Sequence, residues 1–203
     1  MRVIESYVKI TPGVLCVDGQ VEETSFSSLN DVYRREIGDY PKFFKMDALC
    51  KLGFIASEIL LRGERSLSSP IEDMAIIMFN RSSSLCNDRN YQRTINGGEG
   101  VVPSPSLFVY TLPNIVTAEI AIRNKIFGET SFYVLDRFNA SLMRDVVDTT
   151  FMDTVTKRVL CGWVDCMSEE DYLAVVYLVA EKADNVADSH KWEEEEIRGI
   201  FNR

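Results

Sequence analysis

The side chains of this 203-residue chain that could act as covalent nucleophiles or metal ligands include five cysteines and one histidine, His190. A structural zinc site needs four Cys or His ligands in close groups, and the only close cysteine spacing here is Cys161-x4-Cys166. We therefore predict no metal and no cofactor. Cys161 lies in an apolar segment, where a thiol packs as a small hydrophobe, so free buried thiols in a reducing cytosol are the favoured interpretation.

Two loops contain residues that could carry chemistry. Three serines at 82–84 follow an apolar run, where nucleophiles often lie, but the nucleophile-elbow pattern is absent and His190 is far away in sequence. The glycine-rich stretch 97–100 lacks the Lys-Ser/Thr end of a P-loop. His190 lies beside the acidic run 193–196, which indicates a solvated helix face and an exposed imidazole. The residues alone therefore supply no complete catalytic set.

Composition narrows the class of protein and of partner. The 46% of apolar residues and 26% of charged residues are ordinary for a globular domain. The net charge of −9 argues against nucleic acid and against an anionic membrane surface, both of which need a basic footprint. No apolar run approaches the length of a membrane span, and no signal peptide is evident. We expect a cytoplasmic protein that forms a single domain over residues 1–203.

The elements that must position any site alternate along the chain. Apolar runs predict strands at 3–9, 73–79, 131–135, 157–164 and 172–180. Periodic segments predict helices at 27–35, 46–62, 113–126, 138–154 and 190–201, with long loops over 11–44 and 80–106. Strands that alternate with helices favour an α/β fold, with a five-stranded, mostly parallel sheet covered by helices on both faces. The link between the last two strands is too short for a parallel crossover, so the last strand is antiparallel.

Charged residues mark the faces of three helices. The stripe on the 46–62 helix consists of Asp47, Lys51, Glu58 and Arg62. The stripe on the 138–154 helix consists of Ser141, Arg144, Asp145 and Asp148. On the 113–126 helix, Glu119 and Arg123 have the i, i+4 spacing of an ion pair. Stripes of this kind indicate helix faces in contact with water.

Residues 104–137 read SPSLFVYTLPNIVTAEIAIRNKIFGETSFYVLDR. This segment resembles the part of β-ketoacyl synthases that leads to their nucleophilic cysteine, with Ser104-Pro105 at its opening. Asn114 matches the residue that opens a helix, and Gly128 matches the glycine that ends it. Met46-Asp47 resembles the start of the family's first long helix, and residues 159–162 (VLCG) resemble a strand that ends in small residues. The resemblance implies the N-terminal half of a thiolase-like fold.

Two departures from the family pattern bear on activity. Counted from Gly128 without a gap, the position of the family's cysteine is occupied by Arg137. A guanidinium stays protonated and cannot attack a carbonyl. The family's catalytic histidines come from a second half that this sequence does not match. The resemblance therefore implies a ketosynthase-like subunit without catalytic activity, with a vacant nucleophile position at Arg137.

Such subunits are known as chain length factors, and they pair with an active ketosynthase in fatty acid, polyketide or aryl-polyene synthesis. The resemblance implies a heterodimer with a full-length ketosynthase, with homodimerisation possible in isolation. It assigns the dimer strand to Ser131, Phe132, Tyr133, Val134 and Leu135. It assigns the border of the partner's acyl tunnel to Phe108, Tyr110, Leu112 and Ile115. An acyl carrier protein would act indirectly, by docking on the partner, because carriers are acidic and this chain is also acidic.

Two alternatives stay open at this stage. The chain could be an acyl-thioester transferase or hydrolase that uses Cys161 or a loop serine as its nucleophile. It could also be a stand-alone binding module for acyl chains or acyl carriers. For Arg137, pairing with Asp136 or with a helix carbonyl is favoured over binding the carboxylate or phosphate of a ligand.

Overall fold

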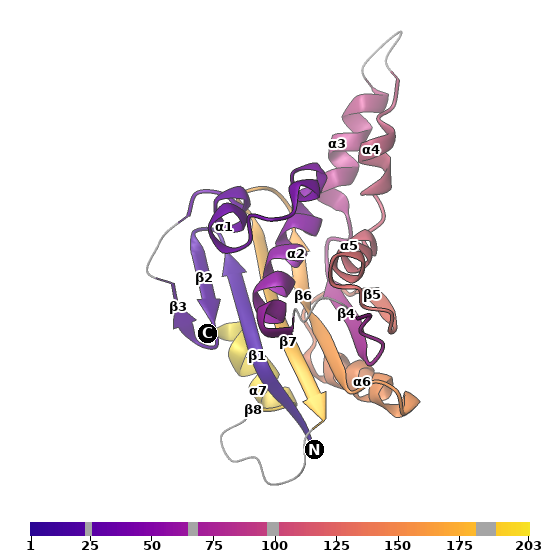
Figure 1. Ribbon diagram of the computed structural model, residues 1–203. Helices are drawn as coiled ribbons and strands as arrows, with labels where there is room; N and C mark the ends of the chain where they lie inside the picture. Colours follow the sequence, from indigo (N-terminus) through magenta and orange to yellow (C-terminus); the bar gives the residue numbers. More distant parts are fainter. Residues whose placement is uncertain (23–25, 65–68, 97–101, 182–189) are drawn as a thin grey trace.

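The computed structural model describes residues 1–22, 26–64, 69–96, 102–181 and 190–203 (Figure 1). The glycine-rich stretch 97–100 lies outside these residues. The strands are β1 (Arg2–Thr11), β2 (Val14–Val17), β3 (Gln20–Val21), β4 (Met74–Asn80), β5 (Thr130–Val134), β6 (Arg158–Cys166), β7 (Tyr172–Glu181) and β8 (His190–Lys191). The helices are α1 (Leu29–Glu36), α2 (Ala48–Leu60), α3 (Leu85–Ile95), α4 (Pro105–Val109), α5 (Ile115–Asn124), α6 (Ala140–Thr150) and α7 (Glu194–Asn202), with 3₁₀ turns η1 (Pro41–Lys45), η2 (Leu61–Glu64) and η3 (Phe151–Asp153).

Across the described residues the strands form one mixed sheet in the order β3-β2-β1-β7-β6-β4-β5, with β8 beside β1. The five strands predicted from the sequence correspond to β1, β7, β6, β4 and β5, which are neighbours in this order. β4 pairs in parallel with β5 and β6, whereas β7 is antiparallel to both β6 and β1. Four of the five therefore run in one direction and the last runs against them, as predicted. Because β7 lies between β1 and β6, two of the four pairings among these strands are antiparallel.

Helices cover both faces of the sheet, which gives three layers (Figure 1). One apolar cluster joins the sheet to α1, α2 and α5, and the other joins it to α6 and α7. β4 is buried along its whole length, and its side chains alternate between the two clusters. Met74, Ile76 and Met78 enter the first cluster, and Ala75, Ile77 and Phe79 enter the second. The continuous apolar run of β4 thus reflects burial on both faces.

The predicted loop 11–44 contains two tight turns that create β2 and β3, which the sequence interpretation missed. Asp18 and Gly19 both have positive φ, at 48° and 82°, as a type I′ hairpin turn requires. Gly13 has φ 77° and closes the turn between β1 and β2. Asp18 is further fixed by its carboxylate, which accepts a hydrogen bond of 2.7 Å from the Tyr7 N–H.

The predicted loop 80–106 contains the helix α3 and the start of the helix α4. They stand side by side and extend beyond the sheet as an arm (Figure 1). Ser104 caps α4 by accepting a hydrogen bond from the Leu107 N–H, and Pro105 occupies the first turn. α3 has only one fully buried side chain, Asn87, so its sequence lacks the apolar stripe by which a helix is recognised.

The C-terminal helix α7 packs on the same sheet face as α6. Phe201 stacks on Phe138, which precedes α6, with ring centroids 3.6 Å apart, and Trp163 of β6 meets both rings edge-on. The opposite side of α6 stays in contact with water, and Arg144 and Asp145 form an ion pair of 2.9 Å there. The predicted wet stripe on this helix is therefore confirmed.

Among the described residues, no helix has the combination of length and hydropathy needed to cross a bilayer.

The sheet interior tolerates no side chain at Gly162, because a Cβ there would lie 2.4 Å from the Val175 carbonyl oxygen. We expect Gly162→Ala to lower the free energy of unfolding by about 1–3 kcal/mol, the usual cost of overpacking. Gly199→Ala on α7 is the matched control, since its nearest neighbour would lie 3.9 Å away and helix propensity improves. Urea unfolding monitored by tryptophan fluorescence measures both. Equal stabilities for the two variants would contradict the packing.

Candidate functional site

Arg137 lies in the connection between β5, which ends at Val134, and α6, which begins at Ala140. Asn139 caps that helix, and its side-chain oxygen accepts a hydrogen bond of 3.0 Å from the Leu142 N–H. The Arg137 side chain is 84% exposed, and its Nε lies 3.9 Å from a carboxylate oxygen of Asp136. An exposed pair of this kind contributes little to stability. The guanidinium therefore occupies the strand–helix junction that the sequence resemblance assigned to the nucleophile.

A shallow cavity of about 280 Å³ opens beside this junction, at the carboxyl ends of the parallel strands. Ligands of open α/β sheets bind at this edge. The residues that line the cavity are Arg81, Arg137, Phe138, Trp163, Asp165, Asp171, Tyr172, Leu173 and Phe201. Asp165 is held in place by the Ser82 N–H at 2.8 Å and the Arg81 N–H at 3.2 Å. These lining side chains supply charge and apolar surface for binding, and they include no thiol and no imidazole.

Three candidate nucleophiles of the sequence, Cys161, Ser82 and Ser84, are buried or hydrogen-bonded in the structure. Cys161 is fully buried in β6, and burial raises the pKa of its thiol well above the usual value. Ser82 donates its hydroxyl to Asp165, and Ser84 donates to the Thr111 carbonyl oxygen at 2.6 Å. His190 lies in β8 opposite Ile4, near the start of β1 and thus at the far edge of the sheet from Arg137. Among the described residues, Cys161, Ser82 and Ser84 therefore lie away from the histidine.

The four residues assigned to the border of an acyl tunnel divide into two pairs. Phe108 and Leu112 are exposed, at 54% and 51%. Tyr110 is buried, and its hydroxyl donates a hydrogen bond of 3.2 Å to Glu119, while Ile115 packs against the core of this chain. Only Phe108 and Leu112 of the four are open to a partner in this structure.

The predicted dimer strand, residues 131–135, is shifted by one residue from β5, which is Thr130–Val134. β5 is the last strand at one end of the sheet. The Leu135 N–H donates to the Asn80 carbonyl of β4, and the Glu129 carbonyl accepts from Ile76 of β4. Because successive residues of a parallel strand turn their polar groups to opposite sides, the N–H groups of Phe132 and Val134 face away from β4. Among the described residues, β4 is the one strand that pairs with β5, so the other side of β5 is an edge of the sheet.

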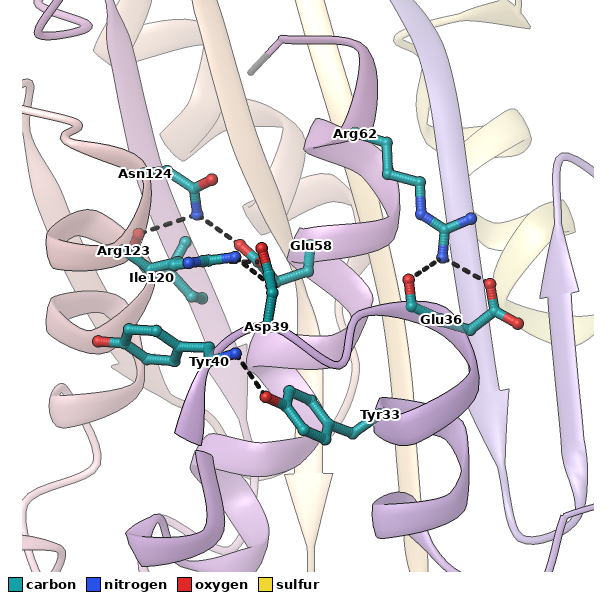
Figure 2. Close-up of polar contacts among 9 residues, drawn as sticks. All are labelled: Tyr33, Glu36, Asp39, Tyr40, Glu58, Arg62, Ile120, Arg123 and Asn124. Carbon is teal, nitrogen blue, oxygen red and sulfur yellow. Dashed lines mark hydrogen bonds and ion pairs between the residues drawn. The ribbon is translucent and has the colours of Figure 1, made fainter. Parts of the chain in front are cut away.

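A buried polar cluster fixes α5, which carries the chain into β5 (Figure 2). Glu58 of α2 is 0% exposed, and its carboxylate accepts hydrogen bonds from Arg123 Nε at 3.2 Å and Asn124 Nδ2 at 2.9 Å. Arg123 also binds Asp39 at 2.5 Å and lies over the Tyr40 ring at 4.8 Å. The cluster thereby joins α5 to α2 and to the segment before η1.

Two sequence predictions about these charges are wrong. Glu58 does not belong to a solvated stripe, because long-range partners on α5 allow its burial. Glu119 and Arg123 have the spacing of an ion pair, but each is paired elsewhere. Glu119 binds Lys42 of η1 at 2.7 Å, while Arg123 binds Glu58.

A larger cavity of about 360 Å³ lies between α1, the start of α2, α3, α4 and the β6–β7 turn, and Tyr172 lines both cavities. Cys86, in the first turn of α3, lines it and is half-buried. Its thiol is hydrogen-bonded by Cys166, the buried last residue of β6, and this bond lowers the pKa of Cys86 to about 7. The same contact, together with burial, raises the pKa of Cys166. Sequence reasoning missed this pair because the two cysteines are far apart in the chain.

Removing Arg123 takes a cation away from the buried Glu58 carboxylate. We expect Arg123→Ala to reduce the free energy of unfolding by about 3–5 kcal/mol, as is usual when one partner of a buried pair is removed. Arg144→Ala is the matched control, since the Arg144–Asp145 pair on α6 lies at the surface and its loss is expected to change the stability little. Chemical denaturation measures both. A loss for Arg123→Ala no greater than that of the control would contradict the role of the cluster.

Alkylation by iodoacetamide tests the state of Cys86. Because only the thiolate reacts, the rate at Cys86 is expected to reach half of its maximum near pH 7 and to level off above about pH 8. Cys161 is expected to stay unmodified in the folded protein. Peptide mass mapping after timed quenching gives the rate at each cysteine. A rate at Cys86 that still rises about tenfold per unit up to pH 9 would show an ordinary thiol.

No protein-family model matches the sequence, and no curated protein matches it. Solved structures do match. The structure of the ishigamide ketosynthase/chain length factor has 15% identity and a TM-score of 0.66, over 93% of this chain and 63% of that chain. The ketosynthase ApeO in complex with its chain length factor ApeC, from Xenorhabdus doucetiae, has 14% identity and a TM-score of 0.58, over 98% and 90%.

A third match is AntDE:AntF, a type II polyketide synthase acyl-carrier protein in complex with its ketosynthase bound to the hexaketide. It has 12% identity and a TM-score of 0.60, over 89% of this chain and 62% of that chain. The chain thus spans less than two thirds of two of these structures and nine tenths of the other. It has the thiolase-like α/β fold of ketosynthases and chain length factors.

Proposed function

We propose that this chain is a non-catalytic, chain-length-factor-like subunit that forms a heterodimer with an active β-ketoacyl synthase. The product class is a fatty acid, a polyketide or an aryl polyene. The chain shapes the complex and leaves the covalent chemistry to the partner's thiol. In the absence of the partner, the same surface allows self-association.

One observation supports the proposal: Arg137 lies in the connection between β5 and α6, where the sequence resemblance expects the nucleophile. The guanidinium is exposed and paired only loosely with Asp136. The cavity beside it is lined by arginine, aspartate and aromatic side chains. Condensation by ketosynthases requires a thiol that becomes acylated, and no thiol lines this cavity. Cys161 is buried, and the hydroxyl groups of Ser82 and Ser84 donate hydrogen bonds to Asp165 and to the Thr111 carbonyl. These placements argue against the enzymatic alternatives.

The surface along α4, α5 and β5 supports a protein partner. These elements follow one another along one side of the molecule (Figure 1). The exposed apolar side chains on and beside them are Phe108, Val109, Leu112, Ile122, Phe127, Tyr133 and Val134. An apolar patch beside an unpaired strand edge is the combination used in strand-paired interfaces. Phe108 and Leu112 are the side chains proposed to border the partner's acyl chain.

Charge limits which subunit receives the acyl carrier. The net charge of −9 repels an acidic carrier at long range. We therefore assign carrier docking to the ketosynthase partner.

Co-expression tests the proposed pairing. Each β-ketoacyl synthase of the organism that encodes this chain is co-expressed with it, one at a time, and purified through a tag on the synthase. The proposal expects one synthase to retain this chain in a one-to-one complex on gel filtration, and to lose product formation when the chain is omitted. A chain that remains a monomer with every synthase would overturn the proposal.

Val134→Pro tests the role of the strand edge. The substitution removes an N–H that faces away from β4, so the sheet of this chain keeps its ladder while the partner strand loses a hydrogen bond. We expect the affinity for the synthase to fall by at least about tenfold, a loss of 1.4 kcal/mol. Val134→Thr retains the N–H and is the control, and thermal melting establishes that both variants fold. Unchanged binding of a folded Val134→Pro variant would place the partner elsewhere.

A further inference from the structure

The larger cavity, of about 360 Å³, lies between the base of the arm and the start of α2, and its lining does not include Phe108 or Leu112. Cavities that hold small ligands occupy about 300–1,000 Å³ and have mostly apolar walls with a few polar groups. The apolar and aromatic side chains that line this one are Leu29, Met46, Leu107, Tyr110 and Tyr172. The cavity therefore has the size and the walls of a small-molecule site.

Asn30 supplies a hydrogen-bond acceptor that this chain does not satisfy. It lies in the first turn of α1 and lines the cavity. Its side-chain oxygen is buried and has no hydrogen-bond partner among the described residues. Buried acceptors are almost always paired, because an unpaired one loses its hydration without compensation. A ligand that donates an N–H from within the cavity removes this cost.

The cavity also contains charges of both signs. The charged side chains that line it are Lys45, Asp47, Lys51, Glu169 and Glu170. Three of them have partners in the chain, since Asp47 caps α2, Lys51 lies over an aromatic ring, and Glu170 accepts a hydrogen bond within its own turn. Lys45 and Glu169 have no ion-pair or hydrogen-bond partner in the part of the chain that the structure describes. One cation and one anion are therefore available to a ligand.

We propose that this cavity binds a free α-amino acid that has an apolar or aromatic side chain. The ligand carboxylate pairs with Lys45. The ligand ammonium group pairs with Glu169 and donates a hydrogen bond to the side-chain oxygen of Asn30. The ligand side chain packs against Tyr110 and Tyr172. A zwitterion fits because it matches both available charges and the buried acceptor, whereas an anion or a cation alone leaves one of them unmatched.

The bound amino acid connects the arm to the rest of the chain. Leu107 of α4 lines the cavity, and its carbonyl accepts a hydrogen bond of 2.8 Å from the Asn87 side chain of α3. The two helices of the arm thus form one wall, and the other walls come from α1, α2 and the β6–β7 turn. All of the ligand contacts belong to this chain, so the site does not require the proposed partner.

Calorimetric titration of the full chain with three probes tests the site. L-Phenylalanine has both charged groups, phenylalaninamide lacks the carboxylate, and 3-phenylpropionate lacks the ammonium group. The chain is expected to bind one L-phenylalanine, and to bind each analogue at least about threefold more weakly, because each loses one charged contact. Equal affinities for the three probes would overturn the proposal. So would a failure of both L-phenylalanine and L-leucine to bind at about 10 mM.

Variants that remove one charge locate the site within the chain. Lys45→Gln is expected to weaken L-phenylalanine by about three- to tenfold and to leave phenylalaninamide unchanged, because that probe has no carboxylate. Glu169→Gln is expected to weaken L-phenylalanine to a similar extent and to leave 3-phenylpropionate unchanged. Both side chains are exposed, so both variants are expected to fold.

The matched controls remove the same charges at the opposite end of the sheet. Lys191→Gln in β8 and Glu193→Gln beside it change exposed residues near the start of β1, whereas Tyr172 of the cavity lies at the other end of the β1–β7 pair. Both controls are expected to bind all three probes as the wild type does. Affinities for L-phenylalanine that are the same in Lys45→Gln as in Lys191→Gln, or in Glu169→Gln as in Glu193→Gln, would overturn the proposal.

Discussion

The carboxylate of Glu58 imposes the strictest constraint on this structure. A charge in the middle of an apolar helix–sheet layer is tolerated only when hydrogen-bond donors surround it. Arg123 and Asn124 provide these donors, and they fix the end of α5 against α2 (Figure 2). A short connection, residues 125–129, leads from the end of α5 to the start of β5, so the contact anchors the chain shortly before the edge strand. Arg137 lies in the connection that follows this strand.

The carboxyl edge of the parallel strands is where this fold places chemistry, and here that edge is divided between two cavities. The one beside Arg137 has charge and aromatic rings, and Phe201 of α7 packs at its side. The other is lined by the half-buried thiol of Cys86. The cavity beside Arg137 has no thiol and no imidazole among its lining residues. The arrangement fits a subunit that contributes surface and shape to a complex.

The sequence predicted the strands β1, β4, β5, β6 and β7, because each has an apolar run. It also predicted the helices α1, α2, α5, α6 and α7. It did not predict α3, whose residues are mostly exposed, or β2 and β3, whose Asp18-Gly19 turn was interpreted as loop. Arg137 was found at its junction because counting from Gly128 needs only local spacing. Glu58 was misplaced because its partner Arg123 lies 65 residues later in the chain. Contacts of this length leave no periodic signal, and the Cys86–Cys166 pair was missed for the same reason.

Acyl labelling of the purified two-chain complex tests the central claim most directly. The complex is incubated with an acyl thioester substrate, and the intact mass of each chain is measured after acid quenching. The account predicts that the ketosynthase gains one acyl group while this chain keeps its mass. A covalent acyl group on this chain would contradict the claim that it lacks a catalytic nucleophile.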